Sequence, residues 1–361
     1  MNKQKILIVN PFGIGDVLFS TPLVALLKQR HPDSFIGYIC NTRAYEVIRS
    51  NPSIDKIFIY EKDDYRKLWE RSKTQCVRRV MDFLRSIKAE RFDVAVDLSL
   101  GYQYSLLLKI IGVKRRAGFN FRNRGRFLTD KVDITSFKDK HVIEHYLDVL
   151  KALDIDTKGF RMGPKVYLSE AGQSAAQGFL KENAIKPDDV LIGMLPGCGA
   201  SWGVDAKFRR WDKANFAHTA DLLVEKYRAK VILFGDAHET ELCDGVRSLM
   251  KHRPVMACGK ASIGEFLALA SRCRLIITND GGPLHMSVGL GVKTVSIFGP
   301  VDEKVYGPYP PGGSHITVTG DAACRPCYRN FKYTKCDLQK CLKTIKPEAV
   351  MKAVDTLLES P

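Results

Sequence analysis

The chain has 361 residues, 45% of them hydrophobic, and its 56 Lys and Arg side chains exceed its 40 Asp and Glu side chains by 16. This length and apolar content exclude a disordered chain and predict two domains. No apolar run approaches the ~20 residues that cross a bilayer, and the first run is too short for a signal peptide, so we expect a cytoplasmic protein. The excess of bases is 10 in residues 1–160 and only 2 in residues 161–323. The first half is therefore predicted to meet an anionic partner.

Strands and helices are predicted to alternate along the whole chain. Apolar runs bounded by turn residues predict strands at 5–9, 35–39, 57–60, 94–98, 190–195, 231–234, 275–278 and 294–298. Helical patterns lie between them, for example at 17–27, 215–227 and 239–250. This alternation is typical of parallel βαβ units, and both halves open with a strand and a Gly-rich loop. We therefore expect an α/β protein of two similar doubly wound domains.

The domain boundary is expected between residues 154 and 186, near the turn at 159–164. This gives an N-terminal domain of residues 1–165 and a C-terminal domain of residues 186–346. Residues 347–361 contain a capped helix pattern that could pack back across the domains. Open α/β sheets bind ligands at the carboxyl ends of their strands, so the loops directly after strands are the candidate sites.

The first such loop places Gly13 and Gly15 before Asp16. The glycines permit a sharp turn, but their spacing fits neither a dinucleotide fingerprint nor a P-loop. Asp16 then has two interpretations. It is the N-cap of the next helix, or it is a carboxylate that accepts a proton from a hydroxyl.

The second loop follows the first strand of the second half and holds Gly197, Gly199 and Ser201, leading to Arg209 and Arg210. Backbone amides, a hydroxyl and two guanidiniums suit a diphosphate, because the Arg fork matches phosphate oxygens. The alternative is a surface turn with solvated arginines.

The third loop is the most informative and runs Asn279-Asp280-Gly281-Gly282-Pro283-Leu284-His285. Its glycines allow a phosphate to approach the first amides of the following helix, and Pro283 fits a helix start. We expect Asp280 and His285 to face one pocket.

A fourth loop carries Asp236 and Glu239 after the strand at 231–234. An acidic side chain at this edge could bind the ribose hydroxyls of a nucleotide. It could equally be an acid at a helix N-terminus.

Taken in order, these motifs resemble glycosyltransferase family 9, the ADP-heptose:lipopolysaccharide heptosyltransferases and their relatives. The resemblance covers roughly residues 5–355. Its motifs are Gly15-Asp16, the loop at 196–201 with Arg-Arg-Trp211, Gly235 with Glu239, and the loop at 279–285 followed by Phe298-Gly-Pro300. It implies the GT-B architecture, in which two Rossmann-like domains face each other across a cleft. The N-terminal domain would receive the acceptor and the C-terminal domain the nucleotide-sugar.

The resemblance also implies the chemistry. Asp16 matches the family's proposed catalytic base. The implied donor-binding residues are Ser201, Arg209, Arg210, Glu239, Asp280, Gly281, Gly282 and His285. The implied reaction is an inverting, metal-independent transfer of heptose from ADP-heptose to the inner core of lipopolysaccharide, with no cofactor required for catalysis. The chain departs from the family at Arg209, where Lys is usual, and at Gly281, where many members have Ser or Thr.

The basic segments of the first half would suit an anionic glycolipid acceptor and peripheral contact with the inner face of the inner membrane. The bases concentrate in residues 66–91 and 109–126. The acceptor-binding candidates are Arg115, Arg116, Arg122 and Arg124. Solvated helix faces are the alternative, and we expect no nucleic-acid partner, because no nucleic-acid module accompanies the charge.

Four cysteines, Cys324, Cys327, Cys336 and Cys341, lie close together near the C-terminus. Thiols at such spacing could hold a structural Zn²⁺ or iron ion. Unligated thiols or a local disulfide are the alternatives.

Two other functions stay open from the sequence. The chain could be a family relative that uses another donor sugar or a protein acceptor, or a nucleotide-sugar-binding or RNA-binding protein without catalysis. The presence of Asp16 together with Asp280 and His285 favours an enzyme.

Overall fold

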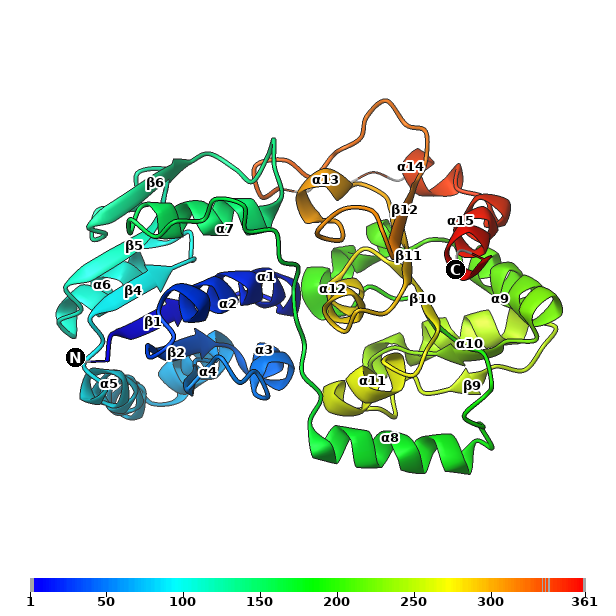
Figure 1. Cartoon of the computed structure of the whole chain (residues 1–361), viewed down its shortest axis with the longest axis horizontal. Helices are drawn as coiled ribbons and strands as arrows, with labels where there is room; N and C mark the ends of the chain where they lie inside the picture. The colour runs from blue at the N-terminus through cyan, green and yellow to red at the C-terminus, as the bar shows by residue number, and fades with distance from the viewer. Residues whose placement is uncertain (1–2, 333, 335, 337, 360–361) are drawn as a thin grey trace. The chain divides into compact units, whose positions relative to one another are not determined.

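The computed structural model describes residues 3–332, 334, 336 and 338–359. The chain divides into two compact units, Met1–Met162 and Gly163–Pro361. Each unit is built on a six-stranded parallel sheet with helices packed against it (Figure 1). Among the described residues, no helix has both the length and the apolar content needed to cross a bilayer.

The first unit has the strand order β3-β2-β1-β4-β5-β6. Its strands are β1 (Lys5–Val9), β2 (Phe35–Cys40), β3 (Lys56–Ile59), β4 (Val94–Asp97), β5 (Arg115–Phe121) and β6 (Asp130–Ile134). Its helices are α1 (Ile14–Phe19), α2 (Thr21–Arg30), α3 (Thr42–Ile48), α4 (Lys62–Arg71), α5 (Lys73–Ala89), α6 (Tyr102–Ile110) and α7 (Val142–Lys151). On one face of the sheet, side chains of β1 pack against α5 and α6 around Phe58 and Phe92.

The second unit repeats this topology in the order β12-β11-β10-β7-β8-β9. Its strands are β7 (Leu191–Leu195), β8 (Lys230–Leu233), β9 (Val255–Met256), β10 (Leu275–Asn279), β11 (Thr294–Phe298) and β12 (His315–Thr319). Its α-helices are α8 (Glu170–Glu182), α9 (Lys213–Tyr227), α10 (Thr240–Leu249), α11 (Ile263–Ala270), α12 (Gly282–Gly289), α13 (Glu303–Tyr306), α14 (Lys340–Lys343) and α15 (Pro347–Glu359). Two 3-10 helices, η1 (Ala200–Arg209) and η2 (Ala237–Glu239), complete it.

In both units the chain starts in the middle of the sheet, winds outward on one side and returns to wind outward on the other. The two points where the direction reverses are β1 beside β4 and β7 beside β10. Such switch points are where open α/β sheets bind ligands, beyond the carboxyl ends of the strands. The prediction of two similar doubly wound domains is confirmed.

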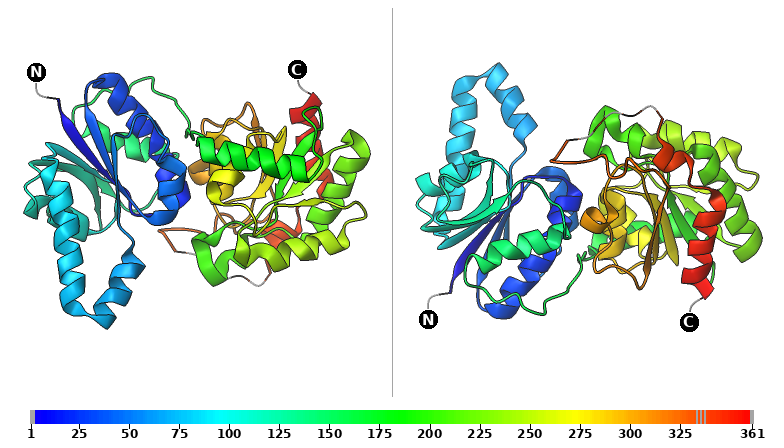
Figure 2. Two further views of the ribbon diagram at one scale, coloured as in Figure 1. Left: turned by 90° about the horizontal axis from the view of Figure 1, so that it is seen from below. Right: turned by 90° about the horizontal axis from the view of Figure 1, so that it is seen from above.

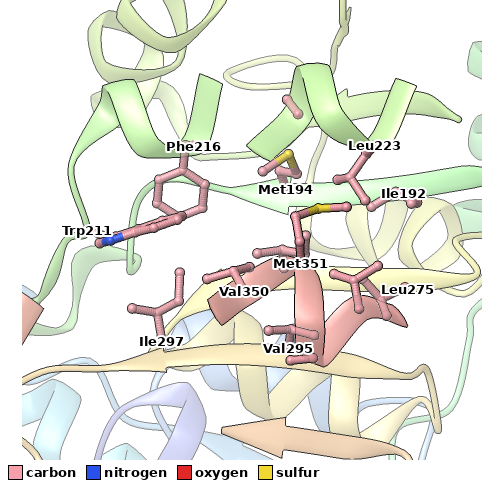
Figure 3. Close-up of a cluster of buried hydrophobic side chains, with 14 of the residues drawn as sticks. Ile192, Met194, Trp211, Phe216, Leu223, Leu275, Val295, Ile297, Val350 and Met351 are labelled. Carbon is pink, nitrogen blue, oxygen red and sulfur yellow. The ribbon is translucent and has the colours of Figure 1, made fainter. Parts of the chain in front are cut away.

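The C-terminal helix α15 contributes Val350 and Met351 to the core of the second unit (Figure 3). These side chains lie over the sheet residues Val295 and Ile297, and the ring of Trp211 closes the same cluster. Trp211 also donates a hydrogen bond from Nε1 to the Ile345 carbonyl oxygen at 3.0 Å. The segment before α15 is thereby fixed to the residues that lead out of η1.

Some local predictions were wrong. The single helix expected at 17–27 is two helices, because the chain breaks at Ser20 and α2 starts again with Pro22 in its first turn. The strands β5, β6, β9 and β12 were not predicted. β5 opens with Arg115 and Arg116, and the edge strand β6 reads Asp-Lys-Val-Asp-Ile, so both lack the apolar run that predicted the central strands.

Candidate active site

Asp16 lies in the loop and helix that follow β1. Gly13 occupies the N-cap of α1, so Asp16 is the third residue of that helix, and its interpretation as the N-cap was wrong. The buried Asn10 side chain holds the turn, because its Nδ2 donates to the Asp16 carbonyl oxygen at 3.0 Å. The Asp16 residue is half-buried at the carboxyl edge of the first sheet. This place suits a proton acceptor that must also meet a substrate, and its role as the base stays a prediction.

Asp97 is a second carboxylate at the same sheet edge, which the sequence analysis did not single out. It ends β4, opposite Val9 of β1, and its side chain is buried. Burial raises its pKa to about 7, although the Ser99 amide donates to its Oδ1 at 3.0 Å. An acidic residue at the end of an otherwise apolar strand was the available sequence signal, and it was missed because the run at 94–98 was interpreted only as a strand.

Asn279 connects the loops after β7 and β10 in the second unit. Its buried side chain donates from Nδ2 to the carbonyl oxygens of Pro196 and Gly197, at 2.7 and 3.1 Å, and accepts from the Trp211 amide at 2.9 Å. This side chain therefore makes hydrogen bonds to three backbone groups of the loops, which are not paired within the sheet. Asn279 belongs to the predicted donor loop, but no local sequence pattern indicated this connecting role.

Glu239 ties the loop after β8 to the loop after β7. Its Oε1 accepts hydrogen bonds from the amides of Cys198 and Gly199, each at 3.0 Å, and its Oε2 accepts from the Asp236 amide at 3.3 Å. The side chain is almost wholly buried and also lies 3.3 Å from Arg210 Nη2. A Cβ at Gly197 would lie 1.9 Å from Glu239 Oε1, so only glycine fits there. Glu239 thus fixes the backbone of the predicted diphosphate loop through the amides of Cys198 and Gly199.

Arg209 and Asp280 form a buried ion pair between the end of η1 and the end of β10. Arg209 Nη2 contacts Asp280 Oδ2, and the two side chains are only 7% and 3% exposed. Burial raises the pKa of Asp280, and the Arg209 guanidinium opposes that rise. Arg210 is more accessible, with 26% of its side chain exposed.

This cluster contains buried polar atoms that make no hydrogen bond to the described residues. Within the described part of the chain, Asp280 Oδ1 and Arg210 Nε are buried and make no hydrogen bond. Buried polar atoms are costly to leave unpaired. Asp280 Oδ1 and Arg210 Nε can therefore accept and donate a hydrogen bond to a ligand at the carboxyl edge of the second sheet.

The glycines and His285 complete this edge. Gly281 is extended, and a Cβ there would lie 2.3 Å from the Cys198 carbonyl oxygen, so the Ser or Thr that the resemblance implies at this position would require a shift of the loop after β7. Gly282 starts α12, and His285 is buried in the first turn of that helix. The structure therefore gathers Arg209, Arg210, Glu239, Asp280, Gly281, Gly282 and His285 at one sheet edge. The side chain of Ser201 lies outside the described part of the structure.

The four acceptor candidates do not form one group. Arg115 and Arg116 start β5, at the amino edge of the sheet, whereas Asp16 lies at the carboxyl edge. Arg115 is bonded to Asp130 at 3.0 Å and to Asp154 at 2.7 Å. Arg116 is bonded to the carbonyl oxygens of residues 113, 114 and 127. Through these contacts both side chains bond neighbouring segments at the amino edge of the first sheet, away from Asp16.

Arg122 and Arg124 follow the carboxyl end of β5 and are exposed. Both guanidiniums lie near the ring of Phe121, at 4.8 and 5.8 Å from its centre. They share the sheet edge of Asp16, so this pair keeps its predicted role as a proposal.

The cysteine cluster gives no support to a metal centre. Cys324 is exposed, Cys327 and Cys336 are half-buried, and Cys341 is buried. Among the described residues, no group of three or more His, Cys, Asp or Glu side chains is arranged to hold a metal ion. The metal prediction therefore remains to be tested by analysis of the purified protein. The six cysteines elsewhere in the chain are buried.

Comparison with known proteins identifies the family. Residues 80–337 match the profile of glycosyltransferase family 9 (heptosyltransferase). The chain is 24% identical to the lipooligosaccharide heptosyltransferase 2 of Campylobacter jejuni over 365 aligned residues, which cover 99% of each. Among solved structures, the family 9 glycosyl transferase of Veillonella parvula superposes with a TM-score of 0.83 at 26% identity, covering 100% of this chain and 99% of that one. The ADP-heptose LPS heptosyltransferase II of E. coli gives 0.75 at 20% identity, covering 99% of each chain.

The two Rossmann-like units and these structural neighbours confirm the predicted GT-B fold. The profile match covers well over half of the chain, and the Campylobacter jejuni relative aligns with 99% of it. The chain therefore belongs to glycosyltransferase family 9, the heptosyltransferase family, and is a glycosyltransferase.

Proposed function

We propose that the protein transfers heptose from ADP-heptose to the inner core of lipopolysaccharide, with inversion at the sugar carbon and without a catalytic metal. The observation that carries the donor side is the pair of unsatisfied polar atoms, Asp280 Oδ1 and Arg210 Nε, among the described residues at the carboxyl edge of the second sheet. A nucleotide-sugar would supply an acceptor oxygen of its diphosphate to Arg210 and a hydroxyl donor to Asp280. The names of the relatives, which are heptosyltransferases, support the choice of sugar.

In the proposed reaction Asp16 takes the proton of an acceptor hydroxyl as the hydroxyl oxygen attacks the anomeric carbon of the donor. The bond from that carbon to the diphosphate oxygen breaks, and ADP leaves with the bonding electron pair. The first amides of α12 and the Arg210 guanidinium stabilise the charge that develops on the leaving diphosphate. Arg209 is committed to the buried Asp280, so we assign it the task of holding that carboxylate in place.

Metal independence is proposed on the placement of the chain's one Asp-x-Asp motif. Asp154 is bonded to Arg115 at 2.7 Å, and Asp156 to Arg30 at 3.2 Å. Both aspartates follow α7 and pair with arginines of the first unit, away from the carboxyl edge of the sheet in that unit.

The acceptor is assigned to the first unit, which contains most of the predicted domain 1–165, and the donor to the second unit, which contains the predicted domain 186–346. Arg122 and Arg124 lie at the same sheet edge as Asp16 and would meet an anionic glycolipid there. If the protein used a different donor sugar or a protein acceptor, the acceptor would still bind at the carboxyl edge of the first sheet and the donor at that of the second. A protein that only binds nucleotide-sugars would not require a carboxylate at the position of Asp16.

The test replaces Asp16 by Asn and measures both transfer and ADP-heptose binding. We expect turnover to fall by at least about 100-fold, because general-base catalysis contributes about 10²–10⁴-fold, while the donor dissociation constant changes little. Glu170→Gln is the matched control, since Glu170 is an exposed acid in the first turn of α8. Near-normal turnover in Asp16→Asn would contradict the assignment of the base.

A further inference from the structure

The helices α4 and α5 form a hairpin that stands out from the first unit (Figure 2). The hairpin starts just after the carboxyl end of β3, at the sheet edge that carries Asp16. Its two helices are joined where Cys76 Sγ donates to the Tyr65 carbonyl oxygen at 3.4 Å. The far end of α5 is anchored by Ile87, which is buried in the core of the unit. The hairpin is thus fixed at its base and presents much of α5 to the surroundings.

Large apolar side chains are exposed on this hairpin. Val77 and Met81 lie one helical turn apart on α5 and are 52% and 45% exposed. Trp69, near the end of α4, is 50% exposed, and Lys73 Nζ lies 5.8 Å from the centre of its ring. An exposed valine or methionine is ordinary by itself, but three large apolar residues on one projecting element mark a contact surface.

Bases surround these apolar side chains. With 100° between successive helical residues, Lys73, Arg78, Arg85 and Lys88 fall on the same face of α5 as Val77 and Met81. All four bases are exposed. The acid of this helix is Asp82, which pairs with Arg85 at 3.0 Å in an exposed position, where such pairs are weak. The face therefore combines an apolar centre with a positive border, which is the composition of a helix that lies in a membrane interface.

We propose that this face, formed by Trp69, Val77 and Met81 with the four bases around them, docks the protein on an anionic lipid surface. The proposal rests on the proposed function, because an acceptor held in a membrane has to be reached at the Asp16 edge. A second copy of the chain would meet the same positive border and be repelled. Nucleic acid would leave the apolar centre without a partner, whereas acyl chains and lipid headgroups match both parts.

The first test measures binding of the full chain, without substrates, to vesicles of phosphatidylcholine and of phosphatidylcholine mixed with phosphatidylglycerol. The charge variant carries Lys73→Gln, Arg78→Gln, Arg85→Gln and Lys88→Gln. The matched control removes four exposed bases of the second unit, by Lys181→Gln, Lys260→Gln, Arg272→Gln and Lys352→Gln. Each base near an anionic surface strengthens binding about fivefold, so we expect at least about a 100-fold loss in the charge variant and less than about threefold in the control.

The second test follows tryptophan fluorescence. Anionic vesicles should shift the emission of the wild-type protein to shorter wavelength, and Trp69→Phe should abolish that shift while leaving most of the binding. This measurement uses a conservative variant and so holds even if the charge variant fails to fold.

Equal binding to neutral and anionic vesicles, or equal loss in the charge variant and the control, would overturn the proposal. The proposal would also be overturned if the four bases were needed for binding of a single-stranded RNA or for self-association, and the protein did not bind vesicles. Transfer to a lipid-free core oligosaccharide separates this proposal from the proposed function. The charge variant should retain that transfer, and its absence in the wild type would contradict the heptosyl transfer but not the vesicle result.

Discussion

Removal of either partner of the Arg209–Asp280 pair should destabilise the second unit, but by unequal amounts. Asp280→Asn leaves a buried guanidinium that cannot give up its proton. Arg209→Met leaves a buried carboxyl group, which can take up a proton because burial already raises its pKa. The first variant is therefore expected to be the less stable one at neutral pH.

The expected size follows from burial. With 7% and 3% of the two side chains exposed, water cannot solvate the charge left behind. Breaking such a pair costs about 3–5 kcal/mol for an unmatched charge, and we expect this range for Asp280→Asn. A domain of this size loses about 2–4 °C in Tm per kcal/mol, so its Tm should fall by roughly 6–20 °C. The double variant, which has neither charge, should be more stable than the sum of the single changes predicts by at least about 2 kcal/mol.

The assay is calorimetric unfolding of the full chain at pH 6 and pH 8 for the wild type, the two single variants and the double variant. Arg209→Met should recover stability at the lower pH, since protonation of Asp280 removes its charge, and Asp280→Asn should not. The control cycle uses Arg247 and Asp244 of α10, which pair at 3.1 Å with about half of each side chain exposed and should couple by less than about 1 kcal/mol. Additive effects at 209 and 280, or a Tm of Asp280→Asn within about 1 °C of the wild type, would refute a charged, desolvated pair.

Two further predictions concern groups outside this pair. Because burial raises the pKa of Asp97 to about 7, from 3.8, its folded form holds the proton more tightly than the unfolded form. Stability contributed at low pH is then lost as the pH rises from about 4 to 7, so Asp97→Asn should exceed the wild type in stability at pH 8 by about 2–4 kcal/mol and show no such gain at pH 4; an equal difference at both pH values would argue against a buried carboxyl. For the cysteines at 324–341, protein purified without chelator should contain about one equivalent of Zn²⁺ or iron if they bind metal, and less than about 0.2 equivalents would exclude the site.

The central strands could be predicted because burial on both faces demands continuous apolar runs. The run 294–298 coincides with β11, and the run 5–9 with β1. The edge strand β6 could not be found in this way, since its sequence, Asp-Lys-Val-Asp-Ile, contains no continuous apolar run. The segment that contains β5 was interpreted as a basic surface because Arg115 and Arg116 were counted as charges, whereas the fold uses both to bond neighbouring segments.

The sequence could predict where the candidate site lies, but not which side chains bond its loops to one another. Strand ends and glycines indicate which loops reach the carboxyl edge of the second sheet, and this led to Asp280, Glu239 and His285. Which side chain bonds which loop depends on the three-dimensional approach of segments some 40 to 80 positions apart, as in the bonds of Glu239 to Cys198 and of Asn279 to Pro196. No local pattern encodes these bonds, so Asn279 and the structural part of Glu239 emerged only from the structure.

The same bonds change how the positive charge of the chain has to be interpreted. Arg209 and Arg210 are balanced within the second unit by Asp280 and Glu239, and Arg115 is balanced within the first by Asp130 and Asp154. Arg209 and Arg115 therefore add to the net charge of +16 without presenting an unbalanced charge to a partner, whereas Arg210 keeps its proposed contact with the donor diphosphate. The exposed bases of α5 differ, because they lie beside exposed apolar side chains, and those of the loop after β5 differ because they are exposed beside the ring of Phe121. A salt-dependent interaction of this protein should therefore respond to substitutions on α5 and hardly at all to changes at Arg115, although both segments looked equally basic in sequence.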